Sequence, residues 1–334
     1  MKSEQSTNAV LMVRPTSFGF DEQTAISNSF QKKVSLDQQE VLKRAEAEFR
    51  QLVDTLAAHG VTVVVFEDDP LPPKPNAVFP NNWLSTWPDG RVYLYPMATK
   101  SRRLERSPRL LMQLSEQFDV KRVIDLTSHE NQETFLESTG VMVFDHVNKI
   151  VYGCVSIRCE EALFRKHADD LGYKPVVVRA YDREGGLIYH TNLLMGVQTS
   201  TAVVCLEAIA DRDEREHFRE SLEQTGHEVV AITMEQVSAC CGNVLEVQNA
   251  VGERFLVLSQ GAYDAFTPAQ RAVLSKDKTL LPVAIPTIET IGGGSVRCMI
   301  AELFLQPKTA LSAGYPAQQR HTTSTQFGTL RQGL

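Results

Sequence analysis

The sequence has little of what marks membrane, secreted, metal-binding or nucleic-acid-binding proteins. No apolar run in its 334 residues approaches the ~20 residues of a membrane span, and the first ten residues lack the apolar core of a signal peptide. None of the six cysteines forms a CxxC pair or a cysteine–histidine cluster with zinc spacing. The net charge of -7 and the lack of a basic stripe argue against a nucleic-acid partner. We therefore expect a cytoplasmic protein with reduced thiols, no membrane or nucleic-acid partner and no metal.

What the sequence does contain is one pattern that returns at intervals of roughly 50–60 residues, which is typical of a repeat architecture. Each repeat has a two-stranded hairpin, a helix and a further short apolar strand. In the first repeat the helix should have Ser35 as its N-cap and stop at Gly60. Hairpins are predicted at residues 83–97, 140–156, 191–209 and 242–259, with helices after them at residues 102–118, 160–172, 212–226 and 267–277.

The first repeat enters with a single strand, Ala9–Arg14, where the other repeats have a hairpin. The missing strand could be Cys298–Leu305, at the far end of the chain. Pairing these two segments would close five repeats into a ring and cover the sheet edges that an open array exposes. We therefore expect one α/β domain over residues 1–307 and a poorly ordered C-terminal tail over residues 308–334.

Five polar segments stand just before apolar strands, where the repeats begin. In a ring of repeats, these segments would meet near the axis. Together they carry one cysteine, one histidine, one glutamate and several asparagines, a set of side chains suited to nucleophilic catalysis. The segments are NAVFPNNW (residues 76–83), FLESTG (135–140), YHTNLLM (189–195), CCGNVLEV (240–247) and GGGSVRCM (292–299).

These segments resemble those of the guanidino-group-modifying enzymes, the pentein superfamily of arginine deiminases, dimethylarginine hydrolases and amidinotransferases. The resemblance is most specific in GGGSVRCM and NAVFPNNW, and it extends to ESTG, HTN and the arginine-rich stretch ATKSRRLER. It covers nearly all of residues 8–306, and the closest subgroup is the citrulline-utilisation hydrolases. The resemblance implies a five-bladed α/β propeller with pseudo-fivefold symmetry. It also implies a small amino-acid substrate and neither a metal nor an organic cofactor.

By this resemblance, Cys298 would be the nucleophile, His190 the general acid–base, and Glu137 the side chain that holds an N–H edge of the substrate. Plainer interpretations of the three are a glycine turn before a buried cysteine, a satisfied core histidine and a loop carboxylate. Arg102 and Arg103 would pair with the substrate's α-carboxylate, unless they only form a solvated helix start.

Three further residues are candidates for the same site. Asn76 would bond the α-amino or α-carboxylate group, and Phe79 would pack on the aliphatic stem of the substrate. Asn243 would be another polar residue near the axis, although a turn asparagine is an equally good interpretation.

The sequence departs from the deiminase pattern at Asn82 and Asn192, which take positions where deiminases have carboxylates. A guanidinium is a cation that offers only N–H donors, so two carboxylates suit it by charge and by geometry. A ureido group is neutral and has a carbonyl acceptor as well as N–H donors. Amide side chains match it without placing a carboxylate against its oxygen.

The leading hypothesis is therefore the hydrolysis of citrulline to ornithine, carbon dioxide and ammonia. One alternative is an arginine deiminase or dimethylarginine hydrolase, in which Asp182 or Glu184 would replace the missing anions. Another is an amidinotransferase, in which an amine resolves the thio-intermediate in place of water. A third is a protein that binds an arginine-like ligand without turnover. The chain could also form a homo-oligomer.

Overall fold

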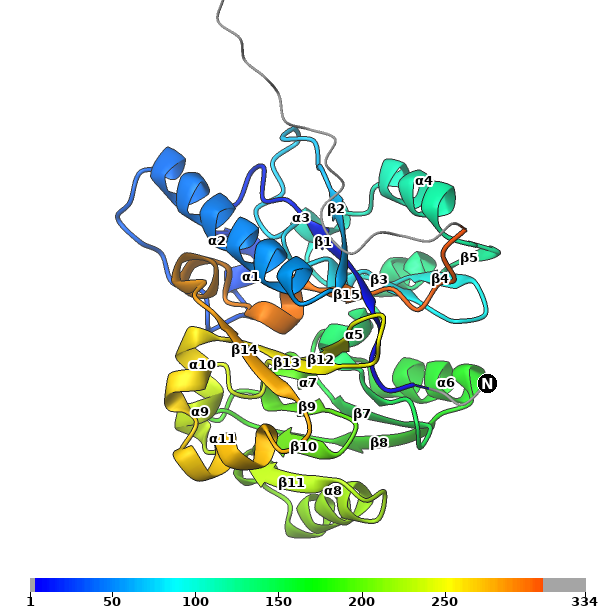
Figure 1. The fold of residues 1–334 in the computed structure, drawn as a ribbon, viewed down its shortest axis with the longest axis vertical. Coiled ribbons are helices and arrows are strands. Elements are labelled where there is room, and N and C mark those ends of the chain that lie inside the picture. Colours follow the sequence, from blue (N-terminus) through cyan, green and yellow to red (C-terminus); the bar gives the residue numbers. More distant parts are fainter. Residues whose placement is uncertain (1–3, 309–334) are drawn as a thin grey trace, which may run out of the picture.

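The computed structural model describes residues 4–308, whose strands form five three-stranded sheets (Figure 1). In each sheet the middle strand pairs antiparallel with the first strand and parallel with the third. This order confirms the predicted repeat of hairpin, helix and strand. The sheets are β15 (Ala301–Glu302), β1 (Ala9–Val13), β2 (Thr62–Phe66); β3 (Leu84–Thr86), β4 (Arg91–Leu94), β5 (Arg122–Asp125); β6 (Val143–Asp145), β7 (Ile150–Cys154), β8 (Lys174–Val178); β9 (Met195–Val197), β10 (Thr201–Val204), β11 (Glu228–Ala231); and β12 (Leu245–Gln248), β13 (Arg254–Ser259), β14 (Thr279–Val283).

The sheet of β15, β1 and β2 joins segments from opposite ends of the chain. Val10 stands opposite Glu302 and Leu11 opposite Ala301, which confirms the expected antiparallel pairing. The predicted strand Cys298–Leu305 is too long, however, because regular pairing is limited to Ala301–Glu302. Cys298 lies just before the strand, in the short helix η5 (Val296–Met299), where its N–H donates to the backbone oxygen of Ser295.

In several sheets the first strand is more deeply buried than the third strand. β3, β6 and β9 are buried along their whole length, whereas β5 and β11 are mostly exposed or half-buried. First strands also contact each other, as β15 does with β3, β6 with β9, and β9 with β12. Figure 1 shows the longer helices α2, α4, α6 and α8 around the periphery. The segments that lead into the first strands are therefore drawn toward the interior.

The helices follow the predicted order, with differences at their ends. They are α1 (Glu22–Ala25), α2 (Gln38–Ala58), α3 (Lys100–Arg103), α4 (Pro108–Gln117), α5 (Ser138–Val141), α6 (Glu161–Leu171), α7 (Thr191–Leu194), α8 (Arg212–Glu223), α9 (Met234–Ser238), α10 (Gln260–Ala265), α11 (Pro268–Leu274), and the short helices η1 (Pro80–Asn82), η2 (Thr127–Gln132), η3 (Leu206–Ala208), η4 (Ile288–Gly292) and η5. Within residues 4–308, no helix has the length and apolar character needed to cross a bilayer.

Two helix predictions need correction. The N-cap of α2 is Asp37 rather than Ser35, because the Asp37 carboxylate accepts the N–H groups of Gln39 and Glu40. The single helix expected over residues 102–118 is divided into α3 and α4. Pro108 forces the residue before it into an extended conformation, so the chain restarts there as a new helix.

The remaining prediction concerns the end of the chain. The tail expected over residues 308–334 lies outside the described residues except for Lys308.

Candidate active site

The polar segments expected near the axis come together in the structure. η1, α5, α7 and η5 each lead into the first strand of a sheet. η5 contacts η1, η1 contacts α5, and α5 contacts α7. The segment of residues 240–247 joins them through Asn243, whose Nδ2 donates to the backbone oxygen of Asn192 at 3.0 Å. Segments that are far apart in the sequence therefore build one site.

Cys298 is only 3 % exposed, and two amide groups face its sulfur. Its Sγ lies 3.5 Å from Asn192 Nδ2 and 3.3 Å from Asn243 Nδ2. The orientation of Asn243 is fixed, because the same Nδ2 donates to a backbone carbonyl. Asn243 therefore belongs to the immediate surroundings of Cys298, together with Asn192.

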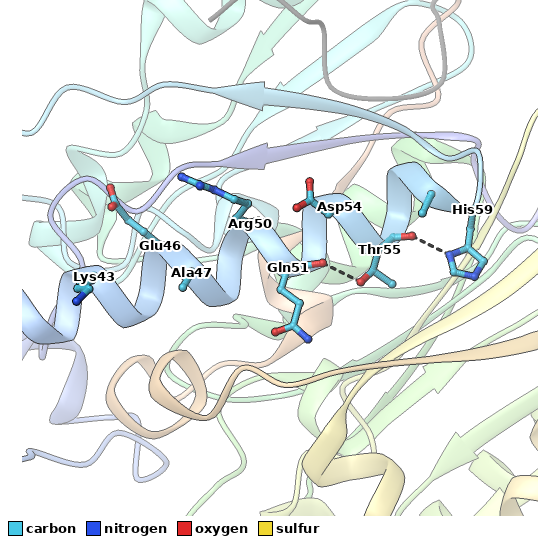
Figure 2. Close-up of a pocket in the computed structure, with 9 residues that line it drawn as sticks. Lys43, Glu46, Ala47, Arg50, Gln51, Asp54, Thr55 and His59 are labelled. Atoms are coloured by element: carbon cyan, nitrogen blue, oxygen red, sulfur yellow. Dashed lines mark hydrogen bonds between the residues drawn. The ribbon is translucent and has the colours of Figure 1, made fainter. Parts of the chain in front are cut away.

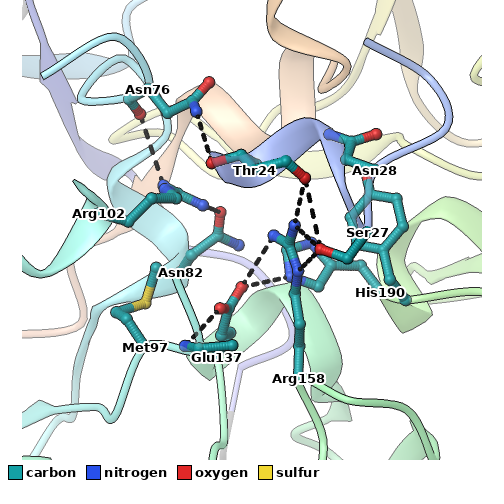
Figure 3. A network of polar contacts seen from close by, with 12 residues as sticks. Thr24, Ser27, Asn28, Asn76, Asn82, Met97, Arg102, Glu137, Arg158 and His190 are labelled. Atoms are coloured by element: carbon teal, nitrogen blue, oxygen red, sulfur yellow. Dashed lines mark hydrogen bonds and ion pairs between the residues drawn. The ribbon is translucent and has the colours of Figure 1, made fainter. Parts of the chain in front are cut away.

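Glu137 bonds to both His190 and Arg158 (Figure 3). Glu137 Oε2 lies 2.7 Å from His190 Nε2 and 3.3 Å from Arg158 Nη1. Burial works against ionisation of Glu137, but the charge of Arg158 and the bond to His190 lower its pKa to about 2. Glu137 Oε1 accepts the N–H of Ala98. The carboxylate is thus ionised and bonded by protein groups, and it orients His190 rather than lining the cavity.

The imidazole of His190 is neutral near pH 7. Burial lowers the pKa of His190 to about 4, against the opposing effect of Glu137. Since Nε2 faces the carboxylate and must donate to it, Nδ1 is the nitrogen that can accept a proton. A histidine in this state can take the proton of a thiol and return it to a leaving amine.

Arg158 is the main site residue that the sequence did not reveal. It is 1 % exposed, and its Nη2 donates to Ser27 Oγ at 2.7 Å and to the backbone oxygen of Thr24 at 3.4 Å. Its guanidinium also stacks over the ring of Tyr189, 4.7 Å from the centroid. The signal in the sequence is weak, a single arginine between apolar residues in VSIRC, directly after a hairpin.

Asn82 is the other residue at the centre of the site (Figure 3). Its Oδ1 accepts from Arg102 Nη1 at 2.6 Å, and its buried Nδ2 has no hydrogen-bond partner among the described residues. A Cβ built on Gly140 would lie 2.3 Å from Asn82 Nδ2 and 3.0 Å from His190 Cε1. Glycine at position 140 therefore makes room for this amide beside the imidazole.

The two arginines expected to bind a carboxylate have different surroundings. Arg102 lines the cavity, but its guanidinium is bonded to Glu105 and to Asn82. Arg103 Nε donates to the backbone oxygen of Met97 and lies 3.4 Å from Glu130, and Arg103 is not among the residues that line the cavity. The structure therefore brings Arg102 to the site and leaves Arg103 outside it.

The glycine run before Cys298 packs against Phe79 and the segment after α1. A Cβ built on Gly292 would lie 2.7 Å from the Phe79 ring, and one on Gly294 would lie 3.0 Å from it. Gly293 has a φ of +64°, and a Cβ there would lie 2.7 Å from the side chain of Asn28. The three glycines also line the cavity beside Cys298, so their lack of side chains leaves the backbone open to the cavity as well as to these neighbours.

These residues enclose a small cavity of about 10 Å³, which holds one water molecule at most. Thr24 and Asn28 line it from the α1 side. Asn76 also lines the cavity, with its Nδ2 donating to Asp21 Oδ2 at 3.1 Å. Among the described residues that line the cavity there are two arginines and no carboxylate.

The carboxylates suggested as replacements for the missing anions lie elsewhere. Asp182 Oδ1 accepts the N–H groups of Glu184 and Gly186, in a turn where the side chain of Glu184 is exposed. Neither carboxylate lines the cavity beside Cys298.

Other candidate sites are weaker. A larger hollow runs along the outer face of α2, between Lys43 and His59 (Figure 2). Its side chains come from one helix, and their hydrogen bonds run within that helix, from Thr55 to Gln51 and between His59 and Thr55, or come from Arg14 to Glu46. Within residues 4–308, no three His, Cys, Asp or Glu side chains are grouped so that they could hold a metal ion.

Solved structures with a similar fold include several enzymes of arginine metabolism. Apo ArgZ, an arginine dihydrolase from the ornithine–ammonia cycle in cyanobacteria, matches with a TM-score of 0.69 and 15% identity, over 92% of this chain and 42% of that chain. AgrE with ornithine and NAD⁺ matches with the same TM-score and identity, over 92% and 40%. DDAH from Pseudomonas aeruginosa in complex with citrulline matches with a TM-score of 0.59 and 14% identity, over 89% and 100%.

The chain thus spans less than half of ArgZ and AgrE, although it covers 97% of the isolated N-terminal domain of ArgZ. At these identities, the likeness to solved structures concerns the fold. No curated protein matches the chain. A family model does match: N,N dimethylarginine dimethylhydrolase, eukaryotic, over residues 14–305. That match covers most of the chain, and it agrees with the segments gathered around Cys298. The chain therefore belongs to the N,N dimethylarginine dimethylhydrolase family, within the guanidino-group-modifying pentein enzymes.

Proposed function

We propose that the protein is a cysteine-dependent hydrolase of a ureido amino acid, and that it converts citrulline and water into ornithine, carbon dioxide and ammonia. The observation that carries this proposal is the wall of the cavity beside Cys298, where arginines and amides are present and carboxylates are not. A guanidinium would find no carboxylate partner among the described residues of this wall, whereas a ureido group is neutral and needs none.

Asn82 provides the matching polar group. Its Nδ2 is buried and unpartnered within the described residues, and an unpaired buried N–H costs about 1–3 kcal/mol. The carbonyl oxygen of a ureido group would accept from Nδ2 and would remove that penalty. A guanidinium has no acceptor with which to do so.

In the first step, His190 Nδ1 takes the proton of Cys298 while Sγ attacks the ureido carbon. The carbonyl oxygen becomes an oxyanion that accepts from Asn82 Nδ2. As the tetrahedral centre collapses, His190 gives the proton to the departing nitrogen. The bond from carbon to this nitrogen breaks, ornithine leaves, and an S-carbamoyl cysteine remains.

In the second step, water attacks the carbamoyl carbon and His190 takes one of its protons. The bond from carbon to Sγ breaks, and the sulfur recovers a proton from His190. The product is carbamate, which decomposes to carbon dioxide and ammonia.

Arg158 is the better candidate for the α-carboxylate of the substrate. It has one carboxylate partner, Glu137 at 3.3 Å, and its other hydrogen bonds go to the neutral groups of Ser27 and Thr24. A substrate carboxylate could replace those neutral acceptors with a charge-assisted pair. Asn76 and Phe79 line the same cavity and would contact the amino-acid portion, as proposed from the sequence.

We further propose that residues 1–307 form a single five-bladed α/β propeller with pseudo-fivefold symmetry. Five sheets of one strand order support this, as does the pairing of β1 with β15. Contacts that run from η5 through η1, α5 and α7 to Asn243 and back to Cys298 are those that a closed ring would have.

The second candidate function is the hydrolysis of arginine or a methylated arginine. The family match favours this function, because the name of the family gives dimethylarginine as the substrate. It requires a guanidinium to bind where amides and arginines line the cavity.

A substrate comparison tests the proposal. The protein is incubated separately with citrulline, arginine and dimethylarginine, and ornithine, citrulline and ammonia are measured. We expect ornithine from citrulline, with a kcat/KM about 100-fold or more above that for either guanidinium, because two charge-assisted bonds are missing. Citrulline formed from arginine at the higher rate would overturn the proposal.

A further inference from the structure

Arg102 is bonded on both edges of its guanidinium, which is unusual for a residue expected to clamp a ligand. On one edge, Nε donates to Glu105 Oε1 at 2.9 Å and Nη2 donates to Glu105 Oε2 at 2.9 Å. On the other edge, Nη1 lies 2.6 Å from Asn82 Oδ1 and Nη2 lies 3.0 Å from the backbone oxygen of Phe79. A carboxylate clamp needs two parallel N–H groups on one edge. Neither edge of Arg102 is open for this.

The bond to Asn82 decides how that amide is turned. Arginine only donates hydrogen bonds, so the atom of Asn82 that faces Nη1 must be Oδ1. Nδ2 is therefore turned the other way, toward His190 and the backbone of Gly140. Without Arg102, the amide could rotate by half a turn and present its oxygen to the cavity.

Glu105 completes the arrangement. Arg102 and Glu105 are 2 % and 5 % exposed, and a buried pair with bidentate geometry holds its position well. Burial works against the charged form of Arg102, but the neighbouring Glu105 raises the pKa of its guanidinium above the usual value. Arg102 therefore stays a permanent donor to Asn82.

We propose that Arg102, backed by Glu105, is a specificity-determining residue that acts through Asn82. It fixes Asn82 so that an N–H donor meets the reacting group, which selects a carbonyl oxygen and disfavours a guanidinium N–H. This inference rests on the proposed ureido hydrolysis. It assigns Arg102 to the reacting end of the substrate and not to the α-carboxylate.

The test compares two substrates that differ only in the α-carboxylate, citrulline and its decarboxylated analogue N-carbamoylputrescine. In Arg102→Met, the hydrogen bond that fixes the orientation of Asn82 is lost. We expect kcat/KM to fall by about 10- to 100-fold on both substrates alike. In Arg158→Met, the proposed carboxylate partner is lost, and we expect the larger fall on citrulline. Arg44→Met removes an exposed ion pair on α2 and should match the wild type.

A fall confined to citrulline in Arg102→Met would overturn the inference, since that is the result for a carboxylate clamp. Arg102→Met leaves Glu105 buried without its partner, so the double variant Arg102→Met, Glu105→Met keeps the test valid if the single variant does not fold. The double variant should show the same equal loss. The double variant should also have a smaller ratio of kcat/KM for citrulline to kcat/KM for arginine. An unchanged ratio would contradict the role of Arg102 in fixing Asn82.

Failure of the proposed function gives a different pattern. In that case the wild type turns over arginine and leaves citrulline intact. Arginine and its decarboxylated analogue agmatine are then tested on the same variants, in place of citrulline and N-carbamoylputrescine. An equal loss on both would keep Arg102 at the reacting end, whereas a loss on arginine alone would reject it.

Discussion

Replacing Cys298 by alanine is expected to abolish turnover, with a loss of about 10⁴-fold or more in kcat. The reason is that Cys298 is the one cysteine among the described residues that line the cavity. Cys298 carries the sulfur that faces the amides of Asn192 and Asn243, and it lines the cavity with His190. The measurement is the release of ornithine from citrulline under saturating conditions.

The matched control is Cys205→Ala. Cys205 is also fully buried, but it packs in a hydrophobic cluster against Met234, away from the cavity. We expect this variant to keep its kcat within about threefold of wild type. Turnover that persists in Cys298→Ala would refute the assignment of Cys298 as the nucleophile.

Replacing Glu137 by glutamine is expected to lower the free energy of unfolding by about 3–5 kcal/mol, because it leaves the Arg158 charge buried without its partner. Glu137 is 0 % and Arg158 is 1 % exposed, so water cannot compensate for the loss. The variant should also lose activity, since the carboxylate that orients His190 is gone. Denaturant unfolding near pH 7 measures the stability change. The control Glu161→Gln breaks exposed or half-exposed ion pairs with Arg165 and Arg179 and should cost at most about 1 kcal/mol.

The pH dependence of this difference is part of the same prediction. The pKa of Glu137 is about 2 in the folded state, below its ordinary value of 4.5, so the folded state binds the proton less readily than the unfolded state. The stabilisation from Glu137 is therefore complete above pH 4.5 and is lost as the pH falls toward 2. The wild type and Glu137→Gln should differ most at neutral pH and converge in acid. A difference that does not change with pH would contradict an ionised Glu137.

The repeat could be predicted from the sequence because it depends on local patterns. Turn residues, apolar alternation and polar segments before apolar strands gave the order that the five sheets have. The helix over residues 102–118 was predicted wrongly because the apolar spacing continues across Pro108, which starts a new helix. The strand at the end of the chain was too long because the backbone at Cys298 turns into η5.

Side-chain pairing could not be predicted, because it is fixed by segments that meet only in the folded chain. Arg102 and Arg103 are neighbours in the sequence, yet one lines the cavity and the other bonds to Met97. Arg158 has no motif of its own, and it enters the site through contacts with Glu137 and Ser27. The homo-oligomer and the cytoplasmic location stay predictions from the sequence.

The amides were recognised from the sequence, but not their orientation. Asn82 could present either its oxygen or its nitrogen to a substrate. The bond from Arg102 Nη1 at 2.6 Å decides between the two. The proposed preference for a ureido group would therefore depend on a contact between η1 and α3 as much as on the identity of residue 82.

The most direct test of the central claim is the mass of the covalent intermediate on Cys298. The enzyme is mixed with citrulline, quenched in acid within its first turnovers, digested, and the peptide that contains Cys298 is weighed. The account predicts that the peptide gains a carbamoyl group from citrulline and that arginine leaves it unmodified under the same conditions. An amidino group gained from arginine, with no adduct from citrulline, would contradict it.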